Sequence, residues 1–275
     1  MKDKEILNRA IKTAQKAGQA ALSFYNSEVE VEQKSDNSPI TQADKESNRI
    51  IIEELKDFDY GILSEEKEDD KTRSDKDRVW IIDPLDGTKD FIHQTDEFAV
   101  MIGLVERSGK IYRPVLGVVY VPARDVVYYG LDGQGAYVQK GDEEPEKLGV
   151  SQHDDPSQCR IVVSRFHGSD LEEKVFQSLG LKEKVPCGSV GVKVSKIASG
   201  EAELNFNPSD KTWEWDVCAP EAILREAGGT LTDMDGRFFN YNKEDPRNYR
   251  GYLATFGEGH NRIIEELEKY EKDQS

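Results

Sequence analysis

Three extended apolar runs joined by short turns lie in the middle of the chain and restrict its fold most. The runs are F-A-V-M-I-G-L-V-E, V-L-G-V-V-Y-V and V-V-Y-Y, and the connections between them contain S-G-K and P-A-R-D. Successive apolar strands with such short connections indicate an antiparallel sheet. The sequence therefore predicts antiparallel β-structure over residues 98–129.

Helical periodicity precedes this sheet. Apolar residues recur at helical spacing over residues 3–25, and a second helix is predicted over residues 41–55. Residues 60–63 and 79–82 are short apolar runs that predict strands, and the charged segment 66–78 between them predicts a solvated loop. The first half of the chain is expected to be α+β.

The glycine-rich stretch G-L-D-G-Q-G-A-Y at residues 130–137 has two interpretations. Its glycines are similar to those of a phosphate-binding loop, but that motif requires an apolar helix directly after it. No such helix pattern follows. A glycine-containing hairpin is the better prediction.

Strands and helices alternate in the second half of the chain. Residues 161–164 and 203–207 predict strands, and residues 170–179, 191–199 and 218–229 predict helices. The last of these helices would have proline in its first turn and glycine at its end. Such alternation is typical of an α/β arrangement.

A polar stretch at residues 139–158 separates the two halves. At 275 residues the chain is long enough for roughly two domains or one large one. We therefore predict an N-terminal α+β half over residues 1–150 and a C-terminal α/β half over residues 151–275.

The composition excludes several classes of function. With 37 basic and 54 acidic residues the net charge is −17, which opposes general attraction to nucleic acid or to anionic lipid. No apolar run reaches the roughly 18 residues of a membrane-spanning helix, and the N-terminus lacks the apolar core of a signal peptide. The cysteines are odd in number and widely spaced, so no disulfide framework is implied: Cys159, Cys187 and Cys218. We expect a cytoplasmic protein.

The stretch W-I-I-D-P-L-D-G-T-K-D-F at residues 80–91 combines an apolar strand with two aspartates around a proline. A simple turn is one interpretation, because Asp, Pro and Gly are common turn residues. A metal site at the carboxyl end of a strand is the other, because the backbone carbonyl of Leu85 would add a further oxygen ligand. Gly87 and Thr88 would then present N–H groups at a helix start, where phosphate oxygens bind well.

Four acidic residues share this context: Glu65, Asp83, Asp86 and Asp216. Each lies where an apolar strand ends or a helix begins, and Asp216 stands just before the predicted helix 218–229. Carboxylates that converge without a cation repel one another, and Mg²⁺ relieves that repulsion because it prefers oxygen ligands. Taken singly, each aspartate is also a good turn or helix-capping residue.

Together these stretches resemble the inositol monophosphatase superfamily of Mg²⁺-dependent, lithium-sensitive phosphatases. The resemblance runs from about Lys34 to Thr255. It rests on S-P-I-T-Q-A-D (38–44), L-S-E-E (63–66), W-I-I-D-P-L-D-G-T (80–88) and W-D-V-C-A-P-E-A-I-L-R-E-A-G-G (215–229). It implies a layered α/β sandwich of the αβαβα type with the metal cleft between its halves.

The resemblance also implies a set of metal ligands. The first metal would be held by Glu65, Asp83 and the Leu85 carbonyl, and the second by Asp83, Asp86 and Asp216, with Asp83 bridging. A weaker third ion would lie near Glu65, so the expected cofactor is Mg²⁺, as two or three ions.

The implied catalytic residues are Thr88, Asp44 and Glu65. Thr88 would position or deprotonate the attacking water, and Asp44 is similar to its partner in the bisphosphate nucleotidase branch. The pattern Thr41-x-x-Asp44 is also a helix-capping box, and the two roles are compatible. A water activated by metal needs no covalent phosphoenzyme, so Cys218 is expected to be a core residue.

Four features resemble the 3′(2′),5′-bisphosphate nucleotidase branch. They are the T-K-D-F form of residues 88–91, P-V-L-G-V-V-Y-V-P-A at 114–123, S-R-F-H at 164–167 and Lys193, where inositol phosphatases carry asparagine. A second phosphate on the substrate requires such a cation in an acidic protein. The resemblance therefore implies that Gly87, Thr88, Ser164, His167 and Lys193 bind substrate.

Each specificity residue has an alternative interpretation. Lys193 could be a solvated helix lysine, and His167 could be a turn histidine. Two positions depart from the branch: Val190 replaces a serine that contacts phosphate, and Asn207 falls near an expected arginine, for which Lys211 could substitute.

The leading functional prediction is a Mg²⁺-dependent phosphatase that converts adenosine 3′,5′-bisphosphate to AMP and phosphate. An inositol or fructose 1,6-bisphosphate phosphatase is the alternative within the enzyme class. A catalytically silent metal-binding regulatory protein is the alternative outside it. The expected partner is a small phosphorylated substrate, with no nucleic acid polymer and no integral membrane association, and the chain is expected to be a monomer or homodimer.

Overall fold

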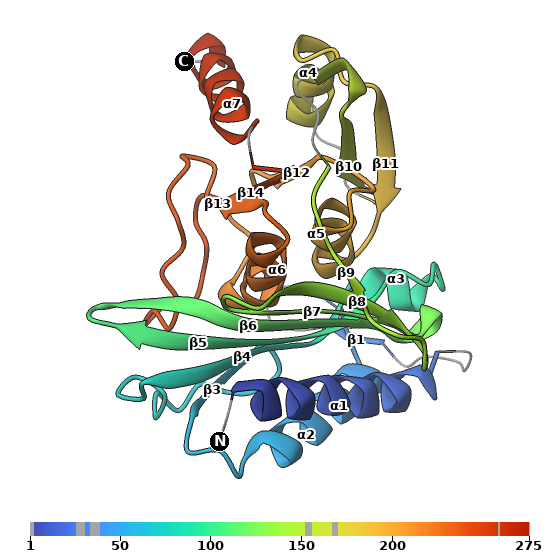
Figure 1. Ribbon diagram of the computed structural model, residues 1–275, viewed down its shortest axis with the longest axis vertical. Coiled ribbons are helices and arrows are strands. Elements are labelled where there is room, and N and C mark those ends of the chain that lie inside the picture. The colour runs from blue at the N-terminus through green and yellow to red at the C-terminus, as the bar shows by residue number, and fades with distance from the viewer. Residues whose placement is uncertain are drawn as a thin grey trace.

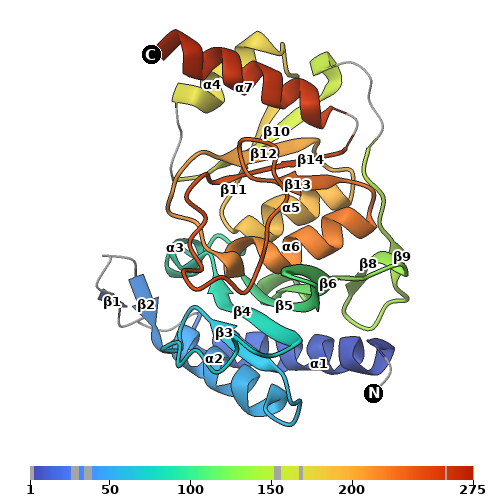
Figure 2. The same cartoon turned by 90° about the vertical axis from the view of Figure 1, so that its left-hand side faces the viewer.

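Helices and sheets of the computed structural model stack in five alternating layers (Figure 1). The structure describes residues 3–25, 31–33, 39–151, 156–166, 170–257 and 259–274. Two pairs of helices form the outer layers and a third pair lies between the two main sheets, as the view turned by 90° also shows (Figure 2). The predicted αβαβα sandwich is confirmed.

The larger sheet contains the antiparallel core that the sequence predicted. Its strands in the described ranges are β3 (Gly61–Ser64), β4 (Arg78–Asp86), β5 (Ala99–Ser108), β6 (Ile111–Val121), β7 (Val126–Leu131), β8 (Gly135–Lys140) and β9 (Glu146–Lys147), in that spatial order. β3 and β4 pair in parallel, and each later pair is antiparallel. Residues 130–137 form the β7–β8 hairpin, so the hairpin prediction is also confirmed.

Helices bury both faces of the central part of this sheet, which explains why β4 and β5 are almost continuously apolar. The helices are α1 (Asp3–Leu22), α2 (Gln42–Leu55), α5 (Val190–Ala198) and α6 (Glu214–Glu226). Successive side chains of β4 point to opposite faces: Trp80 packs with α1 and α2, and Ile81 packs with α5 and α6.

The smaller sheet has the order β11-β10-β12-β14-β13. Its strands and outer helices are β10 (Arg160–Ser164), β11 (Glu183–Cys187), β12 (Leu204–Asn207), β13 (Thr230–Thr232), β14 (Tyr252–Thr255), α4 (Asp170–Ser178) and α7 (His260–Gln274). The remaining elements are α3 (Thr88–Ile92) and the pair β1 (Val31–Gln33) and β2 (Pro39–Thr41). The predicted alternation of strand and helix in this half is confirmed, although β11, with Pro186 inside it, and the later elements β13, β14 and α7 were not predicted.

Two local predictions around the acidic residues were wrong. β4 does not end at the first aspartate but continues through Pro84 to Asp86, with an irregular register between Asp83 and Asp86. Proline is tolerated in a strand at such an irregularity. α6 begins at Glu214 rather than four residues later, so Asp216 lies in its first turn and Pro220 lies inside the helix.

The charged segment 66–78 is a loop that leads into β4, but it is not fully solvated. The side chain of Arg73 is among the most deeply buried in the protein. Gly61 of β3 permits this approach, because a Cβ at that position would lie 2.6 Å from the Cβ of Arg73.

The predicted division of the chain at residue 150 falls in the connection between β9 and β10. Residues 152–155 of that connection lie outside the described ranges. Within those ranges, no helix has both the length and the apolar character needed to span a bilayer.

Candidate active site

Asp83 and Asp86 lie at the carboxyl end of β4, and both side chains are buried. Asp83 Oδ1 accepts the Leu85 N–H at 3.0 Å. Asp86 Oδ2 accepts the Gly191 N–H at 2.7 Å and the hydroxyl of Ser189, both at the start of α5. The two aspartates are therefore oriented by backbone N–H groups and one hydroxyl.

Asp83 lies near enough to the other three predicted acidic ligands for their charges to act on it. Burial raises the pKa of Asp83 well above its usual range, and the nearby charges of Glu65, Asp86 and Asp216 raise it further. Burial also raises the pKa of Asp86, although hydrogen bonds from the start of α5 and the charge of Lys193 oppose that effect. Such buried, mutually repelling carboxylates favour an added cation.

Parallel pairing of β3 with β4 brings Glu65 to this edge of the sheet. Ser64 is in register with Ile82, and the Glu65 N–H donates to the Ile82 carbonyl at 3.1 Å. Asn48 of α2 holds the same segment: it accepts from the Ser64 hydroxyl at 2.8 Å and donates to the Glu66 carbonyl at 3.2 Å.

Asp216 reaches the neighbourhood from the other half of the chain. It occupies the third position of α6, and its Oδ2 accepts the Trp213 N–H at 2.6 Å. This bond satisfies one of the unpaired N–H groups at a helix start. The capping role suggested by the sequence is therefore present, and the charge of Asp216 also raises the pKa of Asp83.

No ready-made metal cage exists in the part of the chain that the structure describes, since no group of three His, Cys, Asp or Glu side chains lies close enough together. Asp83, Asp86 and Asp216 each use an oxygen in the protein hydrogen bonds given above. These carboxylates are near enough to repel one another, but they do not converge on a single point among the described residues. Asp83 and Asp86 are buried, whereas Glu65 and Asp216 are half-buried. An all-oxygen donor set of this kind fits Mg²⁺ rather than zinc.

Thr88 opens the short helix α3 and lies between two acceptors. Its hydroxyl is 3.2 Å from Asp44 Oδ1 and 3.3 Å from the Leu85 carbonyl oxygen. The other oxygen of Asp44 accepts the Thr41 N–H at 2.7 Å and the Thr41 hydroxyl at 2.6 Å. Asp44 thus completes the capping box of α2 with one oxygen and faces Thr88 with the other.

Most of the residues predicted to bind substrate lie within the described ranges: Gly87, Thr88, Ser164 and Lys193. Lys193 on α5 has an exposed fraction of 7%, and its charge acts on both Asp86 and Asp90. Gly87 caps α3 in the left-handed conformation at φ 87°, and Ser164 ends β10. His167 lies outside the described residues.

Sequence analysis missed an ion-pair cluster beside α3. Arg165 donates to Glu97 Oε2 at 2.6 Å, and Arg124 donates to Glu97 Oε1 at 3.0 Å.

Gly188, before α5, packs so closely on Asp90 that a Cβ would lie 1.9 Å from the Asp90 Cγ. The missed Ser189 had a signal in the sequence, because serine before an apolar helix is a typical N-cap.

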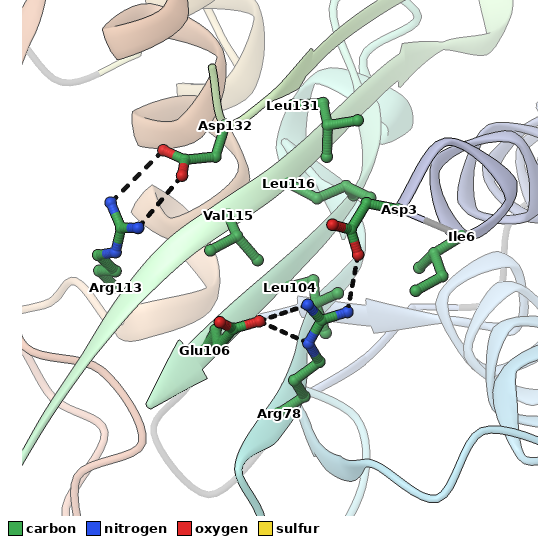
Figure 3. A pocket seen from close by; sticks show the side chains of 10 residues that line it. All are labelled: Asp3, Ile6, Arg78, Leu104, Glu106, Arg113, Val115, Leu116, Leu131 and Asp132. Atoms are coloured by element: carbon green, nitrogen blue, oxygen red, sulfur yellow. Dashed lines mark hydrogen bonds and ion pairs between the residues drawn. The ribbon is translucent and has the colours of Figure 1, made fainter. Parts of the chain in front are cut away.

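A separate cavity of about 110 Å³ lies at the opposite end of β4 (Figure 3). Arg78 points toward Glu106 and Asp3 there, and Arg113 points toward Asp132. Each arginine is neutralised by carboxylates of the same cavity. This leaves little net charge for a phosphorylated ligand, so the cavity is not the candidate site.

Comparisons with known proteins match nearly the whole chain. Residues 2–272 match the inositol monophosphatase family. The chain is 34% identical to the 3′(2′),5′-bisphosphate nucleotidase CysQ of Aggregatibacter actinomycetemcomitans, over 87% of this chain and 88% of that protein. It is 33% identical to the CysQ of Salmonella typhimurium, over 91% and 99%.

Solved structures of this family superpose over nearly the whole chain. The CysQ of Bacteroides thetaiotaomicron, described as a bacterial member of the inositol monophosphatase family, is 32% identical with a TM-score of 0.76, covering 91% of this chain and 97% of that one. The Thermotoga maritima IMPase has a TM-score of 0.82 at 24% identity, covering 98% and 100%, and this likeness supports the fold alone.

Proposed function

The chain belongs to the inositol monophosphatase family, and from that premise we propose that it is a Mg²⁺-dependent phosphatase that removes the 3′-phosphate of adenosine 3′,5′-bisphosphate. The family is one of phosphomonoesterases that act on small phosphorylated substrates. The relatives named bisphosphate nucleotidases, at 32–34% identity, support the finer assignment.

Glu65, Asp83, Asp86, Asp216 and the Leu85 carbonyl would hold the cations. Bound Mg²⁺ supplies an activated water and neutralises charge on the phosphoryl group. Most of these ligands come from residues 1–150 and Asp216 comes from residues 151–275, so the cleft would lie between the two proposed halves.

Thr88 and Asp44 are the proposed proton-handling pair. When the Thr88 hydroxyl donates to Asp44 Oδ1, its lone pairs are available to accept a hydrogen bond from the attacking water. Burial raises the pKa of Asp44 above its usual range, and Glu65 raises it further against the hydrogen bonds from Thr41. A more basic carboxylate is better suited to hold the proton that the water loses as its oxygen bonds to phosphorus. The bond between phosphorus and the ribose 3′-oxygen breaks in the same displacement, and that oxygen takes up a proton and leaves as the 3′-hydroxyl of AMP.

The observation that carries the choice of substrate is the burial of Lys193 beside Asp86 and Asp90. A lysine kept away from bulk water next to the acidic site would serve a second anionic group of the substrate. Charge-assisted hydrogen bonds of this kind are stronger than neutral ones. A monophosphate would not need such a contact.

A substrate panel tests the proposal. Phosphate release from adenosine 3′,5′-bisphosphate, inositol 1-phosphate and fructose 1,6-bisphosphate would be measured with Mg²⁺ and with EDTA. We expect the highest kcat/KM for the adenosine compound and no turnover in EDTA. Preference for inositol phosphate or fructose bisphosphate would replace the nucleotidase assignment, and no turnover of any substrate would favour a silent regulatory protein.

Replacing Lys193 by alanine sharpens this test. Loss of a charged hydrogen bond worth about 1.5–3 kcal/mol lowers kcat/KM for the bisphosphate by roughly 10- to 150-fold. Turnover of inositol 1-phosphate should barely change. Lys196→Ala is the matched control, because Lys196 lies one turn later on α5 and pairs with Glu201 at 3.2 Å. An equal loss on both substrates would show that Lys193 only supports the fold.

A further inference from the structure

Two residues of β4 lie opposite a single residue of β5 between the two aspartates of the candidate site. Asp83 is in register with Met101, and Asp86 is in register with Ala99. This arrangement is a β-bulge, in which one strand carries an extra residue. In a regular strand, residues three positions apart point to opposite faces, but the extra residue brings both aspartates to the same face.

The shared face is the one that α5 covers. A Cβ on Gly191, in the first turn of α5, would lie 3.3 Å from Asp86 Oδ2 and 2.5 Å from Met101 Sδ. Met101 is the residue opposite Asp83. Leu85, between the two aspartates, belongs instead to a buried apolar cluster on the side of α1 and α2, across the sheet from α5 (Figure 1). The bulge therefore decides whether both aspartates can face the same cation.

Ser47 of α2 holds the backbone inside this bulge. Its side chain is fully buried, and its hydroxyl donates to the Pro84 carbonyl oxygen at 2.7 Å. A bulge interrupts the hydrogen bonding between strands, so the peptide groups within it depend on other partners for their orientation. The Pro84 carbonyl belongs to the peptide unit that leads into Leu85, whose own carbonyl is a proposed ligand. Ser47 thus fixes the peptide between the two aspartates.

The same face of α2 contacts other segments of the candidate site. Asp44 lies three positions before Ser47, and its Oδ1 is 3.2 Å from the Thr88 hydroxyl. Asn48 directly follows Ser47 and bonds to both neighbours of Glu65. Residues at i, i+3 and i+4 lie side by side on a helix. The bulge is therefore tied to a helix that also holds the neighbouring parts of the site.

We propose that Ser47 is a positioning residue for the cations of the proposed function, on which this inference rests. Its hydrogen bond to Pro84 keeps the bulge in the conformation that turns Asp83 and Asp86 to one face. Removing a residue that orients metal ligands typically weakens metal binding by roughly 10- to 100-fold. Because Ser47 acts through the backbone and not on a carboxylate, the lower end of that range applies.

Thermal unfolding in the presence of MgCl₂ measures this affinity without turnover. The full-length protein is freed of metal with EDTA, dialysed and titrated with MgCl₂ at constant ionic strength, because general screening also affects so acidic a chain. A cation that binds the native state raises Tm as its concentration rises. We expect Ser47→Ala to need about 10-fold more Mg²⁺ than the wild type for the same rise in Tm.

Three further variants separate positioning from support of the fold. Ser195→Ala removes another buried serine hydroxyl, one without a hydrogen-bond partner among the described residues, and should leave the rise in Tm with Mg²⁺ unchanged. Ser47→Thr keeps the hydroxyl but adds a methyl group to a packed site, so it should lower Tm of the metal-free protein and retain the wild-type Mg²⁺ affinity. Asp83→Asn removes a proposed ligand and should lose most of the rise.

The inference is overturned if Ser47→Ala needs no more Mg²⁺ than the wild type, whatever its Tm without metal. It is also overturned if Ser47→Thr or Ser195→Ala loses as much Mg²⁺ affinity as Ser47→Ala. Failure of the proposed function is a different result: the wild type and Asp83→Asn would then show the same rise in Tm with Mg²⁺. That outcome would remove the proposed metal site itself and the role of Ser47 with it.

Discussion

Replacing Arg73 by alanine should disconnect two loops that approach the candidate site from opposite halves of the chain. The Arg73 guanidinium donates to Asp69 Oδ2 at 2.6 Å, to Asn242 Oδ1 at 2.5 Å and to the Lys243 carbonyl at 2.9 Å. The backbone N–H of Asn242 donates in turn to Glu214 Oε2 at 2.7 Å. The loop that follows β3 is thereby tied to the first turn of α6.

The expected loss of stability follows from the burial of the Arg73–Asp69 ion pair. Arg73 is 1% exposed, and removing one partner of a buried ion pair costs about 3–5 kcal/mol because the other charge is left uncompensated. Asp69 keeps the ammonium of Lys71 at 2.9 Å and is 18% exposed, so the lower end applies. We expect the free energy of unfolding to fall by about 3 kcal/mol, which lowers Tm by about 5 °C for a chain of 275 residues.

Urea and thermal unfolding followed by circular dichroism measure this loss. Arg107→Ala is the matched control, because the Arg107–Asp77 ion pair is 39% and 79% exposed at its two ends. Exposed pairs contribute less than about 1 kcal/mol, so the control should unfold close to the wild type.

A second readout concerns the metal site. The loop carrying Arg73 follows Glu65, and α6 carries Asp216, so the variant should need more Mg²⁺ for half-maximal activity. A Tm within about 2 °C of the wild type, or equal losses in Arg73→Ala and Arg107→Ala, would refute the argument from burial. Unchanged Mg²⁺ dependence in a destabilised variant would refute the link to the proposed metal ligands Glu65 and Asp216.

Other perturbations test single contacts. Asp83→Asn should abolish phosphate release from every substrate, and a rate near wild type would contradict its role as a metal ligand. Gly188→Ala places a Cβ 1.9 Å from Asp90 Cγ and should cost about 1–3 kcal/mol in urea unfolding, whereas Gly149→Ala, whose Cβ meets nothing within 4 Å, should not. Burial lowers the pKa of His260 to about 4, so the unfolded state binds more protons below its own pKa of roughly 6.5. Stability should therefore fall as pH drops from roughly 6.5 to 4, and His260→Gln should flatten that part of the Tm–pH curve.

The elements that local pattern determines were predictable. The continuous apolar run of β4 follows from burial on both faces of the sheet, and the capping box at Thr41 and Asp44 follows from spacing alone. Spacing could not show that Asp44 uses its second oxygen to face Thr88, because that contact joins residues 44 positions apart.

The start of α6 was misplaced for a related reason. Proline is favoured in the first turn of a helix, so Pro220 suggested a start near residue 218. The helix instead begins at Glu214, whose carboxylate is buried and accepts the N–H groups of Asn242 at 2.7 Å and Lys243 at 2.9 Å. These two N–H groups lie in a loop that is distant from Glu214 in sequence, so no local sequence pattern predicts the contacts.

Arg73 shows how such distant partners decide burial. It lies within a run of thirteen residues, E-K-E-D-D-K-T-R-S-D-K-D-R, in which most side chains are charged and local sequence gives each the same expectation of exposure. Its burial depends on Asn242 and the Lys243 carbonyl, about 170 positions away, because an arginine leaves water only where its donors are satisfied. The carboxylate of Glu214 at the start of α6 is likewise buried only because distant N–H groups satisfy its oxygens. The contacts that join the segment after Glu65 to the helix of Asp216 are therefore properties of the folded chain, whereas the carboxylates that we propose as metal ligands are predicted from short motifs.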